Sequence, residues 1–147
     1  MKVVIGCDHG GFELKLKVID HLKEKGYEVI DKGCDSTASV DYPAYAAAVA
    51  KSVVGGEADK GIVICTTGIG ISIAANKFDG IRAALCTNAT MAEMTRAHND
   101  ANVLALGAAI IGDHLALDIV DTFLTTEFSG MEKHCRRISQ IAELENN

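Results

Sequence analysis

The sequence predicts an α/β domain, a Rossmann-like three-layer α/β/α arrangement with a five-stranded parallel sheet. Short apolar runs alternate with longer stretches of helical periodicity along the chain. This alternation is typical of a parallel sheet that carries helices on both faces. The 147 residues suit one domain of ordinary size, and neither a repeat nor a Pro-, Gly- or Ser-rich linker interrupts them. We therefore expect residues 1–147 to form a single domain.

The first half of the chain is expected to hold three strands and two long helices. Residues 11–25 have helical spacing, and Gly26 ends this helix. The apolar residues that set the spacing are Phe12, Leu16, Ile19 and Leu22. A second helix begins at Asp41-Tyr42-Pro43, where a capping residue precedes an early proline, and it runs to Gly55-Gly56. The expected strands are 2–6, 27–31 and 61–65.

The second half is expected to add two strands, 81–86 and 102–106, and four helices. The expected helices are 69–77, 89–97, 113–126 and 132–144. In parallel sheets, ligands bind beyond the carboxyl ends of the strands. Asp8-His9 and the segment 65–68 both follow strands and should meet at this edge. His98-Asn99-Asp100 precedes a strand, so it would join them only if its loop curled over the edge.

Composition disfavours several classes of protein. The net charge of -6 leaves too little positive charge to neutralise nucleic acid or an anionic membrane. No apolar run approaches the roughly 20 residues that a membrane span needs, and the residues after Met1 do not resemble a secretory leader. Five scattered cysteines without a CxxC pair fit reduced thiols better than a disulfide framework or a zinc site. We expect a cytoplasmic protein that uses no metal.

The segment from Cys65 to Ser72 is the first candidate site. A buried strand delivers a thiol to a glycine-rich turn and a helix start, where backbone N–H groups bind anions and stabilise a thiolate. Cys65 could therefore act as a base while the amides of residues 68–72 hold an oxyanion. It could equally be a small buried apolar residue beside a tight turn. A nucleotide site is a further alternative, but Ile73 stands where the dinucleotide fingerprint has its third glycine.

Histidines and a basic cluster form the second group of candidates. His98 suits general acid–base chemistry near neutral pH, although a lone histidine at a helix end is more often exposed or a cap. His9 carries the same ambiguity. Lys133 and Arg137 are four residues apart, so a helix would place them on one face. That face could bind a phosphate or simply be solvated.

Six ordered blocks of sequence together form a more specific pattern than any single motif. The blocks are GCDHGG at 6–11, VDYP at 40–43, GIVIC at 61–65, TGIGISIAANK at 67–77, GIRAA at 80–84 and HNDANVLALG at 98–107. In this order they resemble the type B ribose-5-phosphate isomerase family and its galactose-6-phosphate isomerase relatives. The resemblance covers essentially the whole chain.

The resemblance implies that ribose 5-phosphate and ribulose 5-phosphate are interconverted through an enediolate, with no metal or cofactor. It makes Cys65 the base that moves a proton between C1 and C2, Thr67 the hydroxyl that assists proton movement between the oxygens, and His98 the residue that opens the furanose ring. Amides around Gly68, Ile69, Gly70 and Ser72 would stabilise the enediolate. The residues matching substrate-hydroxyl contacts are Asp8, Tyr42 and Asn99, and those matching phosphate-side contacts are His9, His134 and Arg137. Lys133 is also expected to bind the substrate.

The same resemblance implies an assembly. In the family, the C-terminal basic residues come from the neighbouring subunit. We therefore expect a homodimer with two shared sites, alone or paired into a tetramer, in which the helix at about 132–144 packs on the partner subunit.

Three residues depart from the family's usual pattern. Thr66 stands where the family has glycine, and a β-branched residue resists positive φ. Ala109 and Lys133 each stand where an arginine is usual. One charged hydrogen bond contributes about 1.5–3 kcal/mol, or roughly 10-fold to 150-fold in affinity. We therefore expect a high Michaelis constant for ribose 5-phosphate, or another substrate such as a hexose 6-phosphate or a free sugar. A non-catalytic partner subunit of a two-chain isomerase is a further alternative.

Overall fold

A single sheet of five parallel strands forms the centre of the computed structural model, which describes residues 1–145. The strands are β1 (Lys2–Cys7), β2 (Glu28–Asp31), β3 (Lys60–Cys65), β4 (Ala83–Leu85) and β5 (Val103–Gly107). Their spatial order is β2-β1-β3-β5-β4, and every pairing is parallel. The predicted parallel sheet is confirmed. β4 is shorter than the predicted strand 81–86 because Ile81 closes a turn onto the Phe78 carbonyl.

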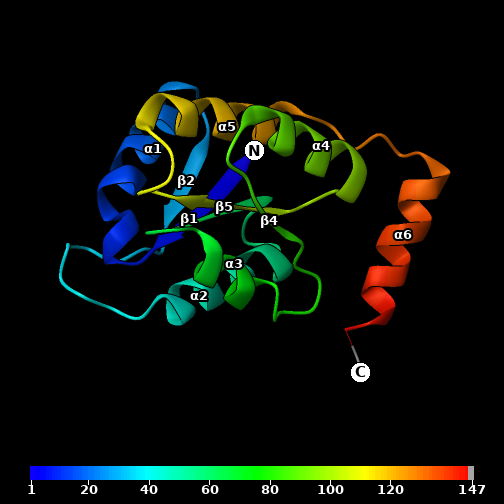
Figure 1. The fold of residues 1–147 in the computed structure, drawn as a ribbon, viewed down its shortest axis with the longest axis horizontal. Helices are drawn as coiled ribbons and strands as arrows, with labels where there is room; N and C mark the ends of the chain where they lie inside the picture. The colour runs from blue at the N-terminus through cyan, green and yellow to red at the C-terminus, as the bar shows by residue number, and fades with distance from the viewer. Residues whose placement is uncertain (146–147) are drawn as a thin grey trace.

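Helices cover both faces of the sheet. They are η1 (His9–Gly11, a 3-10 turn), α1 (Phe12–Glu24), α2 (Tyr42–Val54), α3 (Ile69–Ala75), α4 (Ala89–Asn99), α5 (Asp113–Thr125) and α6 (Glu132–Glu143). In Figure 1, α1, α4 and α5 lie on one face and α2 and α3 on the other. The predicted three-layer arrangement is therefore confirmed. α6 stands apart at one end of the molecule.

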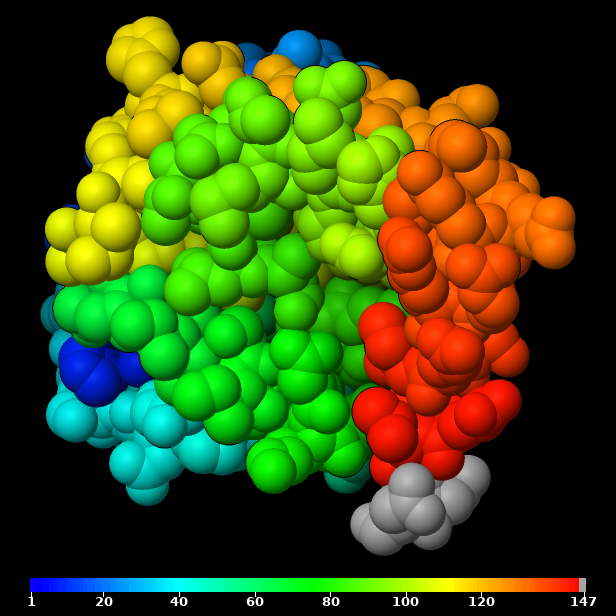
Figure 2. Space-filling view, turned by 45° about the vertical axis from the view of Figure 1, so that its right-hand side comes forward, coloured from blue at the N-terminus to red at the C-terminus, as the bar shows by residue number. Residues whose placement is uncertain are grey.

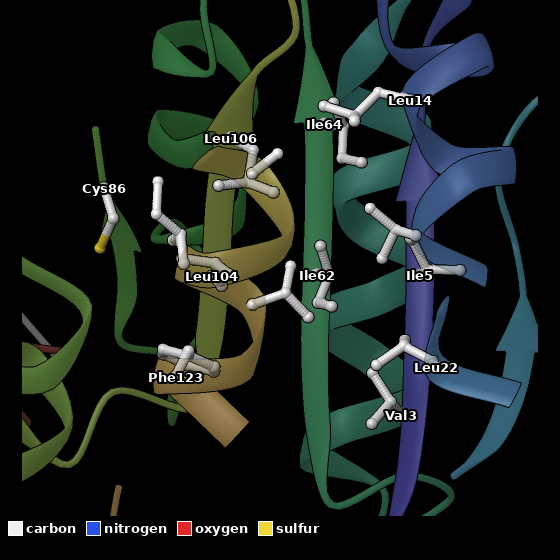
Figure 3. Packing of buried hydrophobic residues seen from close by; sticks show 14 of the residues in the cluster. Val3, Ile5, Leu14, Leu22, Ile62, Ile64, Cys86, Leu104, Leu106 and Phe123 are labelled. Carbon is white, nitrogen blue, oxygen red and sulfur yellow. The ribbon is translucent and has the colours of Figure 1, made fainter. Parts of the chain in front are cut away.

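The two faces of the sheet have separate cores. On one face, isoleucines and leucines of β1, β3 and β5 pack against α1 and α5, where Leu22 and Phe123 are fully buried (Figure 3). On the other face, Val4, Val63 and Ala105 pack against the alanine-rich helix α2. Each central strand is therefore apolar at nearly every position, as buried parallel strands are.

One of the apolar residues that set the helical spacing of α1 does not face the core. Leu16 is 45% exposed, whereas its neighbour Lys15 is only 2% exposed. The Lys15 ammonium bonds to both carboxylate oxygens of Asp31, at 3.0 and 3.1 Å, and to the Cys34 carbonyl at 2.6 Å. These partners replace lost water, and the long alkyl stem contributes apolar contact. Lys15 therefore lies on the inner face of α1, whereas Leu16 lies on its outer face.

None of the helices within residues 1–145 combines the length and the apolar character needed to cross a membrane.

The orientation of α1 on the sheet can be tested by making the same substitution at two of its leucines. Leu14 is 5% exposed and Leu16 is 45% exposed. We expect Leu14→Ala to lower the free energy of unfolding by about 2–5 kcal/mol, because it leaves a cavity beside the sheet. Leu16→Ala should change it by less than about 0.5 kcal/mol. Urea denaturation followed by circular dichroism measures both, and equal losses would contradict the observed orientation of α1.

Candidate functional site

The thiol of Cys65 lies at the carboxyl edge of the sheet, where β3 turns into α3. The side chain is buried, and the Gly68 N–H donates a hydrogen bond to Sγ at 3.1 Å. Gly68 has φ +77° and approaches the backbone of Leu106 and Gly107 so closely that a Cβ would lie 2.8–2.9 Å from it. Glycine is required here both for the backbone conformation and for the space. The turn thus holds the sulfur at the first turn of the helix.

The first turn of α3 presents backbone N–H groups beside this thiol. The Ile69 N–H donates to Thr67 Oγ1 at 3.2 Å, and the Ser72 N–H donates to the Gly68 carbonyl at 3.3 Å. The N–H groups of Gly70 and Ile71 belong to the turn in which an α-helix supplies no backbone acceptor. Sequence reasoning treated residues 68–72 as one unit, and only the structure separates the engaged amides from these two.

Asp8 and His9 extend the same edge from β1. The Asp8 N–H donates to the Ile64 carbonyl at 3.3 Å, which joins this segment to β3. The Asp8 carboxylate is nearly buried and accepts a hydrogen bond from the Gly10 N–H at 2.9 Å. His9 Nδ1 accepts from the Val40 N–H at 3.2 Å, so in the neutral ring Nε2 carries the proton. Asp8 and His9 therefore line the carboxyl edge, as predicted.

Tyr42 reaches this edge from the first residue of α2. A Cβ on Gly70 would lie 2.6 Å from the tyrosine ring, so the ring rests against the start of α3. Tyr42 is 37% exposed. The structure thus brings the candidate residues that follow β1, begin α2 and follow β3 to one edge of the sheet. They are Asp8, His9, Tyr42, Cys65, Thr67, Gly68, Ile69, Gly70 and Ser72.

Two of the unusual residues also lie at this edge. Thr66 keeps a negative φ, because within residues 1–145 Asp100 is the only non-glycine residue with a positive one. The Thr66 hydroxyl packs against Gly10 and takes the space that a Cβ atom on Gly10 would need. The Ala109 N–H donates to the Thr66 carbonyl at 2.9 Å. Ala109 is therefore beside the thiol-bearing turn, and its exposed methyl group contributes no charge.

His98 and Asn99 do not join the carboxyl edge of their own chain. They end α4, which runs back from β4 and delivers the chain to the start of β5. The last turn of α4 consequently lies at the amino edge, where Arg82 Nε donates to the Asn99 carbonyl at 3.0 Å. The loop after α4 thus does not curl over to the carboxyl edge, and within one chain His98 and Asn99 do not join Cys65.

A second cluster forms where α4 meets α6. The His98 and His134 rings are stacked, with centroids 4.4 Å apart and planes 13° from parallel. His134 is nearly buried, whereas Lys133 and Arg137 on the same helix are exposed. Burial lowers the pKa of His134, and the nearby positive charges of His98, Lys133 and Arg137 lower it further. This basic cluster is chemically suited to an anion.

Exposed apolar side chains lie on α3 and α4, the helices that precede and follow the edge strand β4 in the chain. Ile69 and Ile73 of α3 and Met91 and Met94 of α4 are each more than 40% exposed. α6 lies beside this part of the chain (Figure 2), and a groove of about 690 Å³ between them is lined by Asn99, Ile141 and Leu144, among others. The sequence carried a signal for part of this surface, since Ile69 and Ile73 are four residues apart on a predicted helix.

No metal centre is suggested by the side chains that the structure describes. Within residues 1–145, no group of three or more His, Cys, Asp or Glu residues is placed so that it could hold a metal ion.

Comparison with known proteins gives consistent matches over nearly the full chain. The model of a family described as ribose/galactose isomerase matches residues 3–141. Ribose-5-phosphate isomerase B of Escherichia coli is 51% identical over 144 residues, which cover 98% of this chain and 96% of that protein. A galactose-6-phosphate isomerase subunit of Clostridium acetobutylicum is 40% identical over 147 residues, which cover 100% of this chain and 85% of that protein. The structure of Clostridium thermocellum ribose-5-phosphate isomerase B matches with a TM-score of 0.98 and 58% identity, covering 99% of this chain and 98% of that one.

The stacked histidines give a prediction about charge. Removing a positive charge beside His134 favours its protonated form, so Arg137→Ala should raise the pKa of His134 from its lowered value. Arg136→Ala is the matched control, because Arg136 adjoins Arg137 in the chain but is not among the charges that lower this pKa. NMR titration of the histidine ring protons measures both. A larger shift with Arg136→Ala would contradict the described orientation of α6.

Proposed function

The chain belongs to the ribose/galactose isomerase family, and from this premise we propose that it interconverts ribose 5-phosphate and ribulose 5-phosphate. It is an aldose–ketose isomerase, as its close relatives are. The hydrogen bond from the Gly68 N–H to Cys65 Sγ is the observation that carries the assignment of a base. It fixes a nucleophilic atom beside the N–H groups of a helix start and the Thr67 hydroxyl.

In the proposed reaction Cys65 takes the proton from C2 of the open-chain aldose and returns it to C1. Negative charge then develops on the oxygens of the enediolate intermediate. The N–H groups of Gly70 and Ile71 are the donors that we assign to this charge, because preorganised amides stabilise a developing oxyanion. The Thr67 hydroxyl would carry a proton between O1 and O2. Each proton removed is thereby returned, and no redox partner is needed.

We assign the other end of the sugar phosphate to the basic cluster. Lys133, His134 and Arg137 supply positive charge for the phosphate, and His98 would open the furanose ring by acid–base transfer. These residues lie at the opposite edge of the sheet from Cys65 within one chain. A complete site therefore calls for Cys65 of one subunit and His98 of the partner subunit.

A symmetric homodimer supplies this pairing twice, and two such dimers would form a tetramer. The exposed apolar residues Ile69, Ile73, Met91 and Met94 are suited to burial in its interface. We expect α6 to pack on the partner subunit, because the groove beside it leaves Ile141 and Leu144 exposed. We also propose a cytoplasmic location, which the five unbonded cysteines support.

Ala109 favours a second candidate substrate. Its methyl group lies beside Thr66 and offers no charged donor to a phosphate. A hexose 6-phosphate or a free sugar therefore remains a specific alternative, and one relative is a galactose-6-phosphate isomerase subunit. Initial rates with ribose 5-phosphate, allose 6-phosphate, galactose 6-phosphate and free ribose, measured in the presence of a chelator, distinguish these substrates. Turnover of none of them would favour a non-catalytic partner subunit.

The assigned base can be tested by substitution. Cys65→Ala should lower kcat by about 10²–10⁴-fold without changing the fold, because general base catalysis contributes about this factor. Cys135→Ser is the control, since this exposed thiol lies on α6 and has no part in the proposed reaction. A direct absorbance assay of ketose formation measures both variants, and full activity of Cys65→Ala would refute the role of Cys65.

Shared sites can be tested by mixing two inactive chains. We expect Cys65→Ala and His98→Asn homodimers each to be inactive in both sites. After joint refolding, half of the dimers should be mixed, and each mixed dimer should have one intact site. The recovered activity should therefore approach about a quarter of the wild-type value, as twofold symmetry requires. If the mixture stays inactive although the two chains exchange, each site must use both residues from one chain.

A further inference from the structure

Two buried thiols that the proposed reaction does not use lie side by side next to the site. Cys7 ends β1, and Cys34 follows β2 in the neighbouring strand position. Their sulfurs are 3.7 Å apart, and the Cys34 N–H donates to the Cys7 carbonyl at 3.2 Å. From this geometry we propose that Cys7 and Cys34 are an oxidative modification site, at which a peroxide closes a reversible disulfide.

A small oxidant can approach this pair from solvent. Cys34 lines a cavity of about 440 Å³ together with Phe12, Lys15 and Asp31. Cys7 is not among the residues that line this cavity. Cys34 is therefore the sulfur that meets the oxidant.

Cys7 is suited to the second step. Burial raises the pKa of Cys7 to about 12, and its contact with the Cys34 thiol raises it as well. The Cys7 thiol is therefore held in its protonated form and is the poorer nucleophile towards peroxide. Its sulfur attacks the oxidised Cys34 sulfur that lies next to it as its proton passes to the hydroxyl that leaves Cys34.

The chemistry balances with hydrogen peroxide as the only co-reactant. The Cys34 thiolate attacks one peroxide oxygen, the O–O bond breaks, and the released hydroxide takes up a proton to become water. Cys34 is then a sulfenic acid. The Cys7 sulfur attacks the Cys34 sulfur, the S–O bond breaks, and the Cys7 proton leaves with the hydroxyl as a second water. Two thiols are oxidised to one disulfide while one peroxide is reduced to two waters.

The fold allows the sulfurs to meet. A disulfide needs them about 2.05 Å apart, which is closer than the present 3.7 Å. β1 is held in the centre of the sheet, but residues 35–39 after Cys34 are exposed and carry no helix or strand. The movement therefore falls on this loop. Because Asp8 follows Cys7 and the loop leads to Tyr42, the disulfide would join two segments that border the candidate site.

The full-length Cys135→Ser protein is the material for the test, since it lacks the exposed thiol that could crosslink chains. It is treated with hydrogen peroxide, denatured, alkylated, digested and analysed by mass spectrometry. We expect the Cys7 and Cys34 peptides to be linked, lighter by two hydrogen atoms and protected from alkylation, and to be released by dithiothreitol. Cys86 is the internal control: it is equally buried, without a second thiol in contact.

The Cys34→Ser protein shows whether Cys7 is oxidised only through Cys34. In Cys34→Ser, Cys7 should stay fully available for alkylation at the same dose of peroxide, because its partner is missing. The proposal is overturned if Cys7 and Cys34 both remain alkylatable when Cys65 is already oxidised. It is also overturned if Cys7 is lost from alkylation to the same extent in Cys34→Ser, or if Cys34 proceeds to sulfinic acid without forming the link.

Discussion

All five strands run in one direction, and this constraint determines on which edge of the sheet the candidate residues after β1 and β3 and at the end of α4 lie. The carboxyl ends of β1 and β3 are neighbours in the sheet, so Asp8, His9 and Cys65 meet without any special loop. Each covering helix must return to the opposite edge before the next strand begins. Residues at the end of a helix are consequently placed far from residues at the end of a strand. His98 and Cys65 are separated by this rule of connection.

Close contacts at two glycines fix the part of the candidate site that one chain supplies. Gly68 brings the turn after β3 against β5, and Gly70 lets the ring of Tyr42 rest on α3. Both contacts fix the short helix whose first N–H groups lie beside the thiol. A larger side chain at either position would displace α3 from β5 or α2, so the packing of the domain and the geometry of the site depend on the same backbone approach.

The fold class and most elements were predictable from the sequence because buried parallel strands are apolar at nearly every position and are separated by helical periodicity. The candidate residues at the ends of strands were predictable for the same reason. The sequence placed His98 before a strand, but whether its loop curled over to the carboxyl edge was not predictable, since that depends on contacts such as the one between Arg82 and the Asn99 carbonyl. Lys15 was missed because burial of a lysine depends on Asp31 and on a carbonyl of a distant loop.

Because the Cys65 thiol and the basic cluster lie apart within one chain, enzyme activity would depend on the association of two chains. In the proposed assembly, catalytic competence belongs to the associated pair, since neither free chain brings a thiol and the basic cluster to the same ligand. Specific activity would then depend on total protein concentration and fall towards zero as dilution drives dissociation. A sugar phosphate bridging the two subunits would oppose that dissociation. Substrate would thus act as a thermodynamic link between protomers, in addition to being turned over by them.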